Sequence, residues 1–126
     1  GGVLLAAGET TVTLKGSKKI GKGSRNQEAA LGLVNSLINP SVPIENNFVA
    51  LAFASDGHDN NEAAGAMVDF ETAKKAQEIK LDPEEFLETH DSFHFFEKTG
   101  DLIFAEQKSF NVADLIVVLK GKNERN

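Results

Sequence analysis

The residues best suited to bind an anion lie together in residues 21–28, which read G-K-G-S-R-N-Q-E. Ser24 followed by Gln27 fits a capping box, so a helix is expected to begin here. The start of a helix offers unpaired N–H groups and a partial positive charge, and Lys22 and Arg25 add full charges to it. This combination favours an oxyanion site, although the spacing is not that of a Walker A loop. The alternative is an ordinary capped helix after a basic turn.

Carboxylates stand in two further polar stretches. Residues 55–61 follow residues 48–54, an apolar run typical of a strand buried on both faces, and ligands of open α/β sheets gather at the carboxyl ends of strands. Asp56 and Asp59 supply the oxygen ligands that Mg²⁺ prefers, and Asp56 also suits a base that orients a substrate hydroxyl. Glu9 stands at an expected turn beside two threonine hydroxyls. In each case the alternative is a solvated polar turn.

A third set of polar side chains raises a metal-binding alternative. His90 and His94 have a spacing seen in zinc sites when both lie on one helix. Asp91 between them is typical of a helix cap, however, which places His90 outside the helix. The phenylalanines that follow, at positions 93, 95 and 96, are assigned to the core. Zinc in the purified protein would be needed to support the metal-binding interpretation.

Composition limits the classes of function. The 126 residues carry a formal net charge of −6, which argues against bulk binding to nucleic acid or to an anionic membrane. No apolar run approaches the roughly 20 residues that cross a bilayer, there is no signal-peptide pattern, and there are no cysteines, so a cytoplasmic protein is expected. Between Glu9 and Glu28 the charged residues are all basic, which points to a small anionic ligand or a solvated loop. These basic residues are Lys15, Lys18, Lys19, Lys22 and Arg25.

The order of elements predicts the fold that positions these side chains. Strands are expected at residues 3–7, 10–14, 48–54, 102–105 and 113–120. Helices are expected from Ser24 to about Asn39, over 70–81, from Asp82 onward and over 91–98. This order predicts an α/β fold, a three-layer α/β/α domain with a mixed sheet. The domain is expected to occupy residues 1–120, with a flexible tail at 121–126.

Five segments resemble, in order, the motifs of one known family, the MOFRL domain. Residues 8–12 are similar to its G-G-E-T-T-V signature, and residues 23–28 to its G-G-R-N-Q-E signature, with a serine in place of the second glycine. Residues 56–66 resemble D-G-x-D-G-P-T-D-A-A-G-A. The elements G-D-L-I and N-V-x-D-L are matched by residues 100–103 and 111–115. The ordered set covers almost the whole chain.

The resemblance implies the C-terminal domain of a class II glycerate kinase, a group of which some members were once called hydroxypyruvate reductases. Such enzymes use ATP and Mg²⁺ to phosphorylate glycerate to 2-phosphoglycerate. Their site lies in a cleft against a larger Rossmann-like N-terminal domain, so such a domain is the implied partner, in the same or a neighbouring chain. Arg25 and Asp56 are then expected to be catalytic, with Arg25 stabilising the transferring charge. The positions expected to bind substrate or phosphate are Glu9, Thr10, Thr11, Lys22, Asn26, Asp59 and Asn111.

Two departures from the family pattern favour an alternative. The family's G-P-T after the second aspartate is replaced by Asn60-Asn61, and its T-G-P-T-G-T by residues 105–110, where Glu106 would repel phosphate. A stand-alone binding or assembly module, which kept the fold and lost phosphate handling, is the second hypothesis, and a homo-oligomer remains open. Phosphoryl transfer depends on positioning and charge, so we expect this domain by itself to be inactive.

Overall fold

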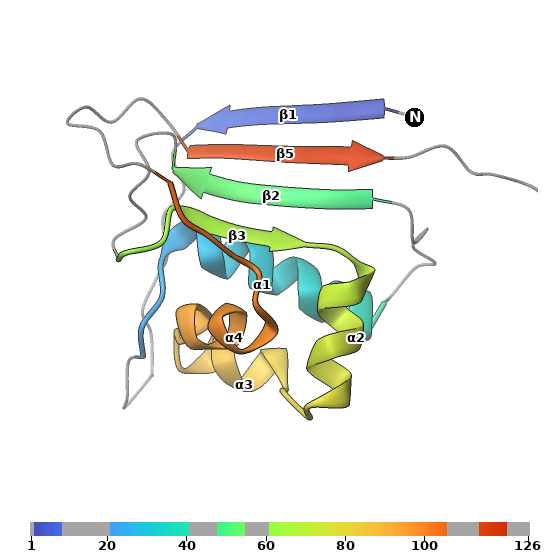
Figure 1. Ribbon diagram of the computed structural model, residues 1–126, viewed down its shortest axis with the longest axis vertical. Helices are drawn as coiled ribbons and strands as arrows, with labels where there is room; N and C mark the ends of the chain where they lie inside the picture. The colour runs from blue at the N-terminus through green and yellow to red at the C-terminus, as the bar shows by residue number, and fades with distance from the viewer. Residues whose placement is uncertain (1, 9–20, 41–47, 55–60, 106–113, 121–126) are drawn as a thin grey trace, which may run out of the picture.

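The computed structural model describes residues 2–8, 21–40, 48–54, 61–105 and 114–120 (Figure 1). The strands are β1 (Gly2–Gly8), β2 (Phe48–Ala54), β3 (Gly65–Val68), β4 (Leu102–Ile103) and β5 (Asp114–Lys120). The helices are α1 (Arg25–Ile38), α2 (Phe70–Glu78), α3 (Pro83–Glu88) and α4 (Ser92–Thr99). The strand expected at 10–14 and the tail expected at 121–126 lie outside the described residues. Among the described residues, no helix has the length and apolar character of a membrane span.

The strands form one five-stranded sheet in the order β1-β5-β2-β3-β4. The α/β class is confirmed, and every neighbouring pair among the described strands is antiparallel, where a mixed sheet was expected. β1 and β2 do run in the same direction, as strands joined through a helix usually do. The closing strand β5 lies between them, however, and is antiparallel to both. The sequence shows the order of the strands along the chain but not the position of β5 between β1 and β2.

The helices share one core with a single face of the sheet. Ala50 and Ala52 of β2 and Val68 of β3 join this core, together with apolar residues of α1, α2 and α4. Burial along β2 alternates near its end, so its other face is only partly covered, and the expectation of a strand buried on both faces was wrong. The described residues therefore form two layers, a sheet and a helical layer (Figure 1), rather than the expected three.

The first helix, α1, forms where its sequence pattern predicts. Ala30, Leu31, Val34 and Leu37 recur at helical spacing, and all four are buried. Ser24 is the N-cap residue, and its hydroxyl accepts a hydrogen bond from the backbone N–H of Gln27 at 3.5 Å. The position of the helix start, on which the predicted anion site depends, is therefore confirmed.

The other helices also begin at capping residues. Asp69 caps α2 in a reciprocal capping box with Thr72, and Asp82 caps α3, with Pro83 as the first helical residue. The second helix ends at Glu78 rather than near residue 81, because Lys80 takes a left-handed conformation with φ of 59°. These starts orient each short helix so that its apolar side meets α1.

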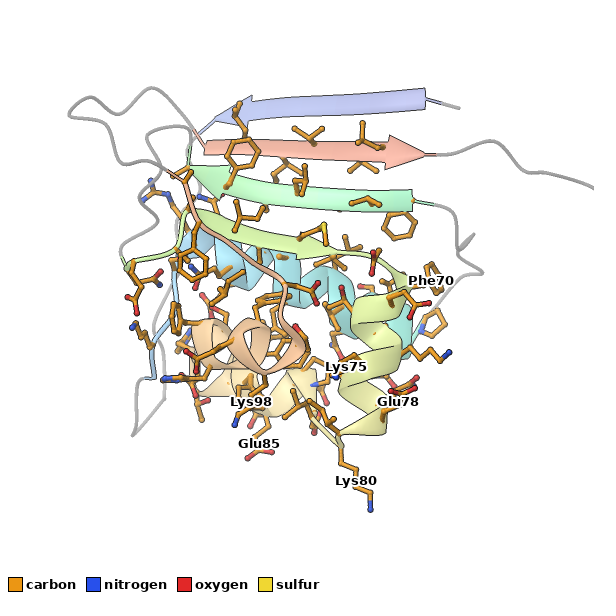
Figure 2. The ribbon with its side chains drawn as sticks, viewed as in Figure 1. Phe70, Lys75, Glu78, Lys80, Glu85 and Lys98 are labelled. Atoms are coloured by element: carbon orange, nitrogen blue, oxygen red, sulfur yellow. The ribbon has the colours of Figure 1, made fainter. Side chains whose placement is uncertain are left out.

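The outer side of the helical layer is charged, whereas its inner side is aromatic. Figure 2 shows Lys75, Glu78, Lys80, Glu85 and Lys98 on the side away from the sheet. The phenylalanines at positions 93, 95 and 96 are at most 3% exposed, so their assignment to the core is confirmed. The ring of residue 95 packs edge-to-face on that of residue 96, with 5.2 Å between centroids.

Candidate anion site at one edge of the sheet

Three segments that carry motif residues follow or precede strands at the same end of the sheet. Asp114, the first residue of β5, pairs with Gly8 at the end of β1 and with Ala54 at the end of β2. The backbone N–H of Ala54 donates to the carbonyl of Ala64, just before β3, at 2.9 Å. The described residues that flank segments 9–20, 55–60 and 106–113 therefore lie side by side, at the left-hand ends of the strands in Figure 1. The pairing register of β1, β5 and β2 brings these strand ends together, and the sequence pattern does not predict that register.

Six of the predicted site residues belong to these segments. They are Glu9, Thr10, Thr11, Asp56, Asp59 and Asn111, and they lie outside the described residues. Their side chains therefore remain predictions, and only the chain positions that flank them are placed. The remaining three, Lys22, Arg25 and Asn26, lie at the start of α1 and are described.

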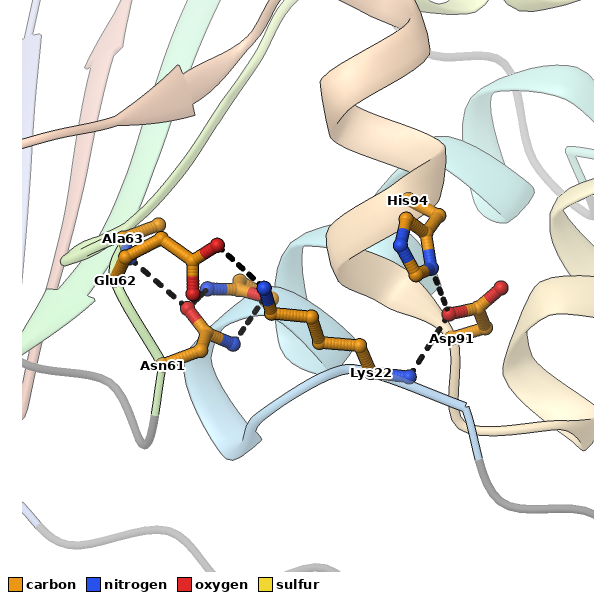
Figure 3. Close-up of polar contacts among 7 residues, drawn as sticks. Lys22, Asn61, Glu62, Ala63, Asp91 and His94 are labelled. Carbon is orange, nitrogen blue, oxygen red and sulfur yellow. Dashed lines mark hydrogen bonds and ion pairs between the residues drawn. The ribbon is translucent and has the colours of Figure 1, made fainter.

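The start of α1 lies next to the returning end of the acidic segment. Asn61 is the first described residue after Asp56 and Asp59, and its side-chain amide forms two hydrogen bonds with that of Gln27, at 2.9 and 3.2 Å. The oxygen of Asn61 also accepts the backbone N–H of Ala63 at 3.0 Å. Gln27 is fully buried. The two paired amides hold the first turn of α1 against the chain that leads into β3. Figure 3 shows Asn61 and the dashed lines of its contacts.

The first turn of α1 combines a helix N-terminus with a guanidinium. Arg25 is the first helical residue and is partly exposed, whereas Asn26 is fully buried. The first amides of a helix lack intrahelical acceptors and carry partial positive charge. A guanidinium beside them can hold a phosphate or carboxylate through two parallel hydrogen bonds. The helix start and its arginine are where the sequence placed them, and the binding of an anion there stays a prediction.

The other predicted cation, Lys22, has partners within the domain. Its ammonium forms an ion pair with Glu62 and lies 4.0 Å from the centroid of the Phe93 ring. The hydrogen bond from Lys22 lowers the pKa of Glu62, so this carboxylate stays ionised beside the ammonium. A bound anion would compete with Glu62 for Lys22. In Figure 3, Lys22 reaches towards Glu62 with its side chain and towards Asp91 with its backbone.

The segment before α1 is fixed along the start of α4. The backbone N–H of Gly21 donates to the carbonyl of Thr89 at 2.7 Å, and that of Phe93 donates to the carbonyl of Lys22 at 2.9 Å. Between these bonds, the N–H of Lys22 donates to Asp91 Oδ1 at 2.9 Å. These contacts join residues about 70 positions apart in the sequence. No periodicity or motif in the sequence signals them, and sequence reasoning missed them.

The two histidines that suggested a zinc site have separate carboxylate partners. His90 Nδ1 lies 2.6 Å from Glu28 Oε1, and His94 Nδ1 lies 2.6 Å from Asp91 Oδ1. His90 precedes α4, as expected from the capping position of Asp91. Within the described residues, no group of three or more histidine, cysteine or acidic side chains is arranged to hold a metal ion. The zinc interpretation therefore gains no support from this part of the chain.

Comparison with known proteins identifies relatives of this chain. The model of the MOFRL family matches residues 2–114. The chain is 37% identical over 118 residues to the "Glycerate 2-kinase" of Pyrococcus horikoshii, with 93% of this chain and 25% of that protein covered. It is 36% identical over 120 residues to a "Putative hydroxypyruvate reductase" of Agrobacterium vitis, with coverages of 94% and 26%.

A solved structure shows the same fold. The crystal structure of a glycerate kinase from Thermotoga maritima superposes with a TM-score of 0.81 at 35% identity, and covers 94% of this chain and 27% of that one. The chain thus spans about a quarter of the length of each of these three proteins.

Proposed function

The chain belongs to the MOFRL family, and we propose that it supplies one side of a site in which ATP phosphorylates glycerate to 2-phosphoglycerate. The names of its relatives support the reaction class. Because those relatives are about four times as long as this chain, the other side of the site is assigned to a Rossmann-like N-terminal domain. The chain by itself is then expected to bind reactants weakly and to catalyse no turnover.

One observation supports the proposal most. The start of α1, with Arg25, lies beside the sheet edge at which the segments carrying Glu9, Asp56 and Asn111 are anchored. In phosphoryl transfer the protein contributes mainly positioning and stabilisation of negative charge. Arg25 and the first amides of α1 would stabilise the charge on the transferring group. Asp56 would orient the glycerate hydroxyl.

The ion and nucleotide that accompany this reaction are assigned to no described residue. The oxygen of Asn61 is already occupied by Gln27 and Ala63, and the described residues form no metal-binding cluster. The roles that remain for this chain are those of its own guanidinium, helix amides and carboxylates.

The second hypothesis, a binding module without catalysis, is favoured by the ion pair of Lys22. Glu62 neutralises one of the two cations of the predicted anion site, and Glu106 replaces a residue of the family's Gly/Thr loop. Glu62 stands where the family motif also has an acidic residue, so only Glu106 departs from the pattern; either carboxylate would repel a bound phosphate. The two hypotheses differ in whether Arg25 serves turnover or only retention of a ligand.

A titration tests anion binding directly. We expect the isotopically labelled chain to show amide shifts at residues 24–27 on addition of 2-phosphoglycerate. The substitution Arg25→Ala should weaken that affinity at least about tenfold, since a charge-assisted hydrogen bond contributes roughly 1.5–3 kcal/mol. Arg125→Ala, the same change near the C-terminus, is the matched control and should leave affinity unchanged. Equal affinities of the Arg25 and Arg125 variants would refute the assigned role.

Turnover requires the missing partner domain. In a chimera, this chain replaces the matching quarter of the Thermotoga maritima glycerate kinase, and ATP-dependent formation of 2-phosphoglycerate is measured. We expect turnover by the chimera, a loss of about 10²-fold or more on Arg25→Ala, and none by the chain alone. A folded chimera that binds 2-phosphoglycerate without turnover would favour the binding module, and turnover by the chain alone would contradict the shared site.

A further inference from the structure

We propose that Asp91 is a positioning residue for the anion site, because its carboxylate ties the segment before α1 to α4 and so fixes the orientation of the first turn of α1. The inference rests on the proposed function, because the site that it positions is the one that contains Arg25. Asp91 itself would touch neither substrate nor nucleotide. Its effect on a ligand would be transmitted through Lys22 and the two residues that follow it.

The first observation is the unusual use of this aspartate. Asp91 stands at the N-cap position of α4, yet within the described residues its side chain accepts no backbone N–H from the first turn of that helix. The other two aspartates at N-caps do cap their own helices. Asp69 accepts from Thr72 N at 2.9 Å, and Asp82 accepts from Glu84 N at 3.1 Å. The carboxylate of Asp91 therefore serves a different segment.

The second observation is where this carboxylate binds instead. Asp91 Oδ1 accepts the backbone N–H of Lys22 at 2.9 Å and lies 2.6 Å from His94 Nδ1. A hydrogen bond to an ionised carboxylate is about twice as strong as a neutral one. The side chain of Asp91 is only 24% exposed, which limits competition from water. Lys22 is two residues before Ser24, the N-cap of α1, so a displaced Lys22 would displace the cap.

The third observation is the tight fit of the same segment against α4. A β-carbon on Gly21 would lie 2.4 Å from the β-carbon of Asp91, and one on Gly23 would lie 2.5 Å from Ser92 Oγ and 2.9 Å from the carbonyl oxygen of His90. Only residues without a side chain fit at such distances. Gly21 and Gly23 therefore allow the backbone of this segment to approach α4 closely.

These observations together predict that Asp91 affects binding more than folding. Two backbone hydrogen bonds, Gly21 N to Thr89 O and Phe93 N to Lys22 O, still join the segment to α4 when the carboxylate is lost. The segment should stay attached but become less restricted in orientation at Lys22. Arg25 and the amides after Ser24 would then spend less time in the geometry that an anion requires.

The test compares two Asp→Ser substitutions. Serine is a good N-cap residue, so Asp91→Ser keeps a cap for α4 but is too short to keep the bond to Lys22. Asp69→Ser is the matched control at the N-cap of α2, where the carboxylate accepts hydrogen bonds from Thr72 of its own helix. We expect Asp91→Ser to weaken 2-phosphoglycerate binding at least about fivefold and Asp69→Ser to leave the affinity within twofold. Asp91→Asn, which keeps the accepting oxygen, should restore most of the affinity.

The outcomes separate the inference from the proposed function. Equal affinities of Asp91→Ser and the wild-type chain, with the Arg25→Ala variant still impaired, would overturn the positioning role and leave the proposed function intact. If the wild-type chain does not bind 2-phosphoglycerate, the proposed function fails, and amide resonances decide the positioning role. Shifts at residues 24–27 in Asp91→Ser but not in Asp69→Ser would support it, and unshifted resonances would overturn it. Should Asp91→Ser not fold, Asp91→Thr and Asp69→Thr, which also keep a capping hydroxyl, are compared by the same criteria.

Discussion

Among the described glycines Gly21, Gly23, Gly32, Gly65 and Gly100, the shortest contact of an added methyl group is found at Gly65. It begins β3 and pairs with Phe53 of β2 and Ile103 of β4. A β-carbon at this position would lie 1.9 Å from the carbonyl oxygen of Ala52 and 2.6 Å from the Cα of Phe53. Both atoms belong to the backbone of a central strand, so no side-chain rotation can relieve the overlap.

The cost of Gly65→Ala follows from these distances. Ordinary contact requires about 3.2 Å or more, so β2 and β3 would have to separate by about 1 Å at this point. The neighbouring bond from Ala54 N to Ala64 O, now 2.9 Å, would exceed hydrogen-bonding distance. One lost hydrogen bond contributes about 1 kcal/mol and overpacking about 1–3 kcal/mol. The free energy of unfolding should therefore fall by about 2–4 kcal/mol.

The matched control is the same substitution in α1. Gly32 has no atom within 4 Å of the β-carbon position, and alanine in a helix interior is more stable than glycine by about 0.5–1 kcal/mol. Gly32→Ala should therefore raise the free energy of unfolding. Both variants are measured by urea unfolding followed by circular dichroism. A Gly65→Ala variant within 1 kcal/mol of the wild type would show that the strands do not approach as closely as the structure has them.

Two further predictions concern the core and the response to pH. Leu31 is fully buried in the core, so Leu31→Ala should lower the free energy of unfolding, measured by urea unfolding, by about 3 kcal/mol, and a loss below 1 kcal/mol would contradict its place in the core. Burial raises the pKa of Asp101 above its ordinary value of 3.8, and the charge of Asp69 adds to the rise, whereas hydrogen bonds from Thr99 and Thr72 oppose it. The carboxyl group of Asp101 therefore holds its proton more tightly in the folded state than in the unfolded chain. Above the folded-state pKa this carboxyl is ionised, and its charge lowers the free energy of unfolding. Asp101→Asn should raise the melting temperature at pH 7, and its advantage should shrink as the pH falls towards 3.8; an advantage that grows on acidification would contradict the assignment.

Local features of the fold were predictable because their causes are local. The capping residue Ser24, the spacing of the buried positions in α1, and Pro83 after Asp82 each act within one turn of a helix. The arrangement of strands was not predictable in the same way. The sequence pattern of β5 is the same whether this strand lies at the outside of β2 or between β1 and β2. Only the second arrangement makes every described pair of neighbouring strands antiparallel.

The same distinction applies to the site. Residues 23–28 could be assigned to a helix start with a guanidinium from their types and spacing. Their contacts with Asn61 and Asp91 could not, because hydrogen bonds across 34 and 69 residues leave no periodic signal. Glu28 and His90 show the limit well. Glu28 belonged to the predicted anion segment and His90 to the zinc alternative, and only the fold shows that they form a pair, with exposures of 11% and 15%.

The start of α1 is held differently from the rest of the helix, and this separates binding from stability. Its first turn is fixed by polar pairs, Gln27 with Asn61 and Glu28 with His90, whereas its later turns are fixed by apolar residues such as Leu31. A polar pair contributes about 1 kcal/mol, and a buried leucine about 3 kcal/mol. Changes in the polar pairs can therefore reorient the anion-binding end while the core stays folded. Conversely, loss of core packing at Leu31 should lower stability while the folded fraction keeps its affinity, because no contact of the first turn is removed.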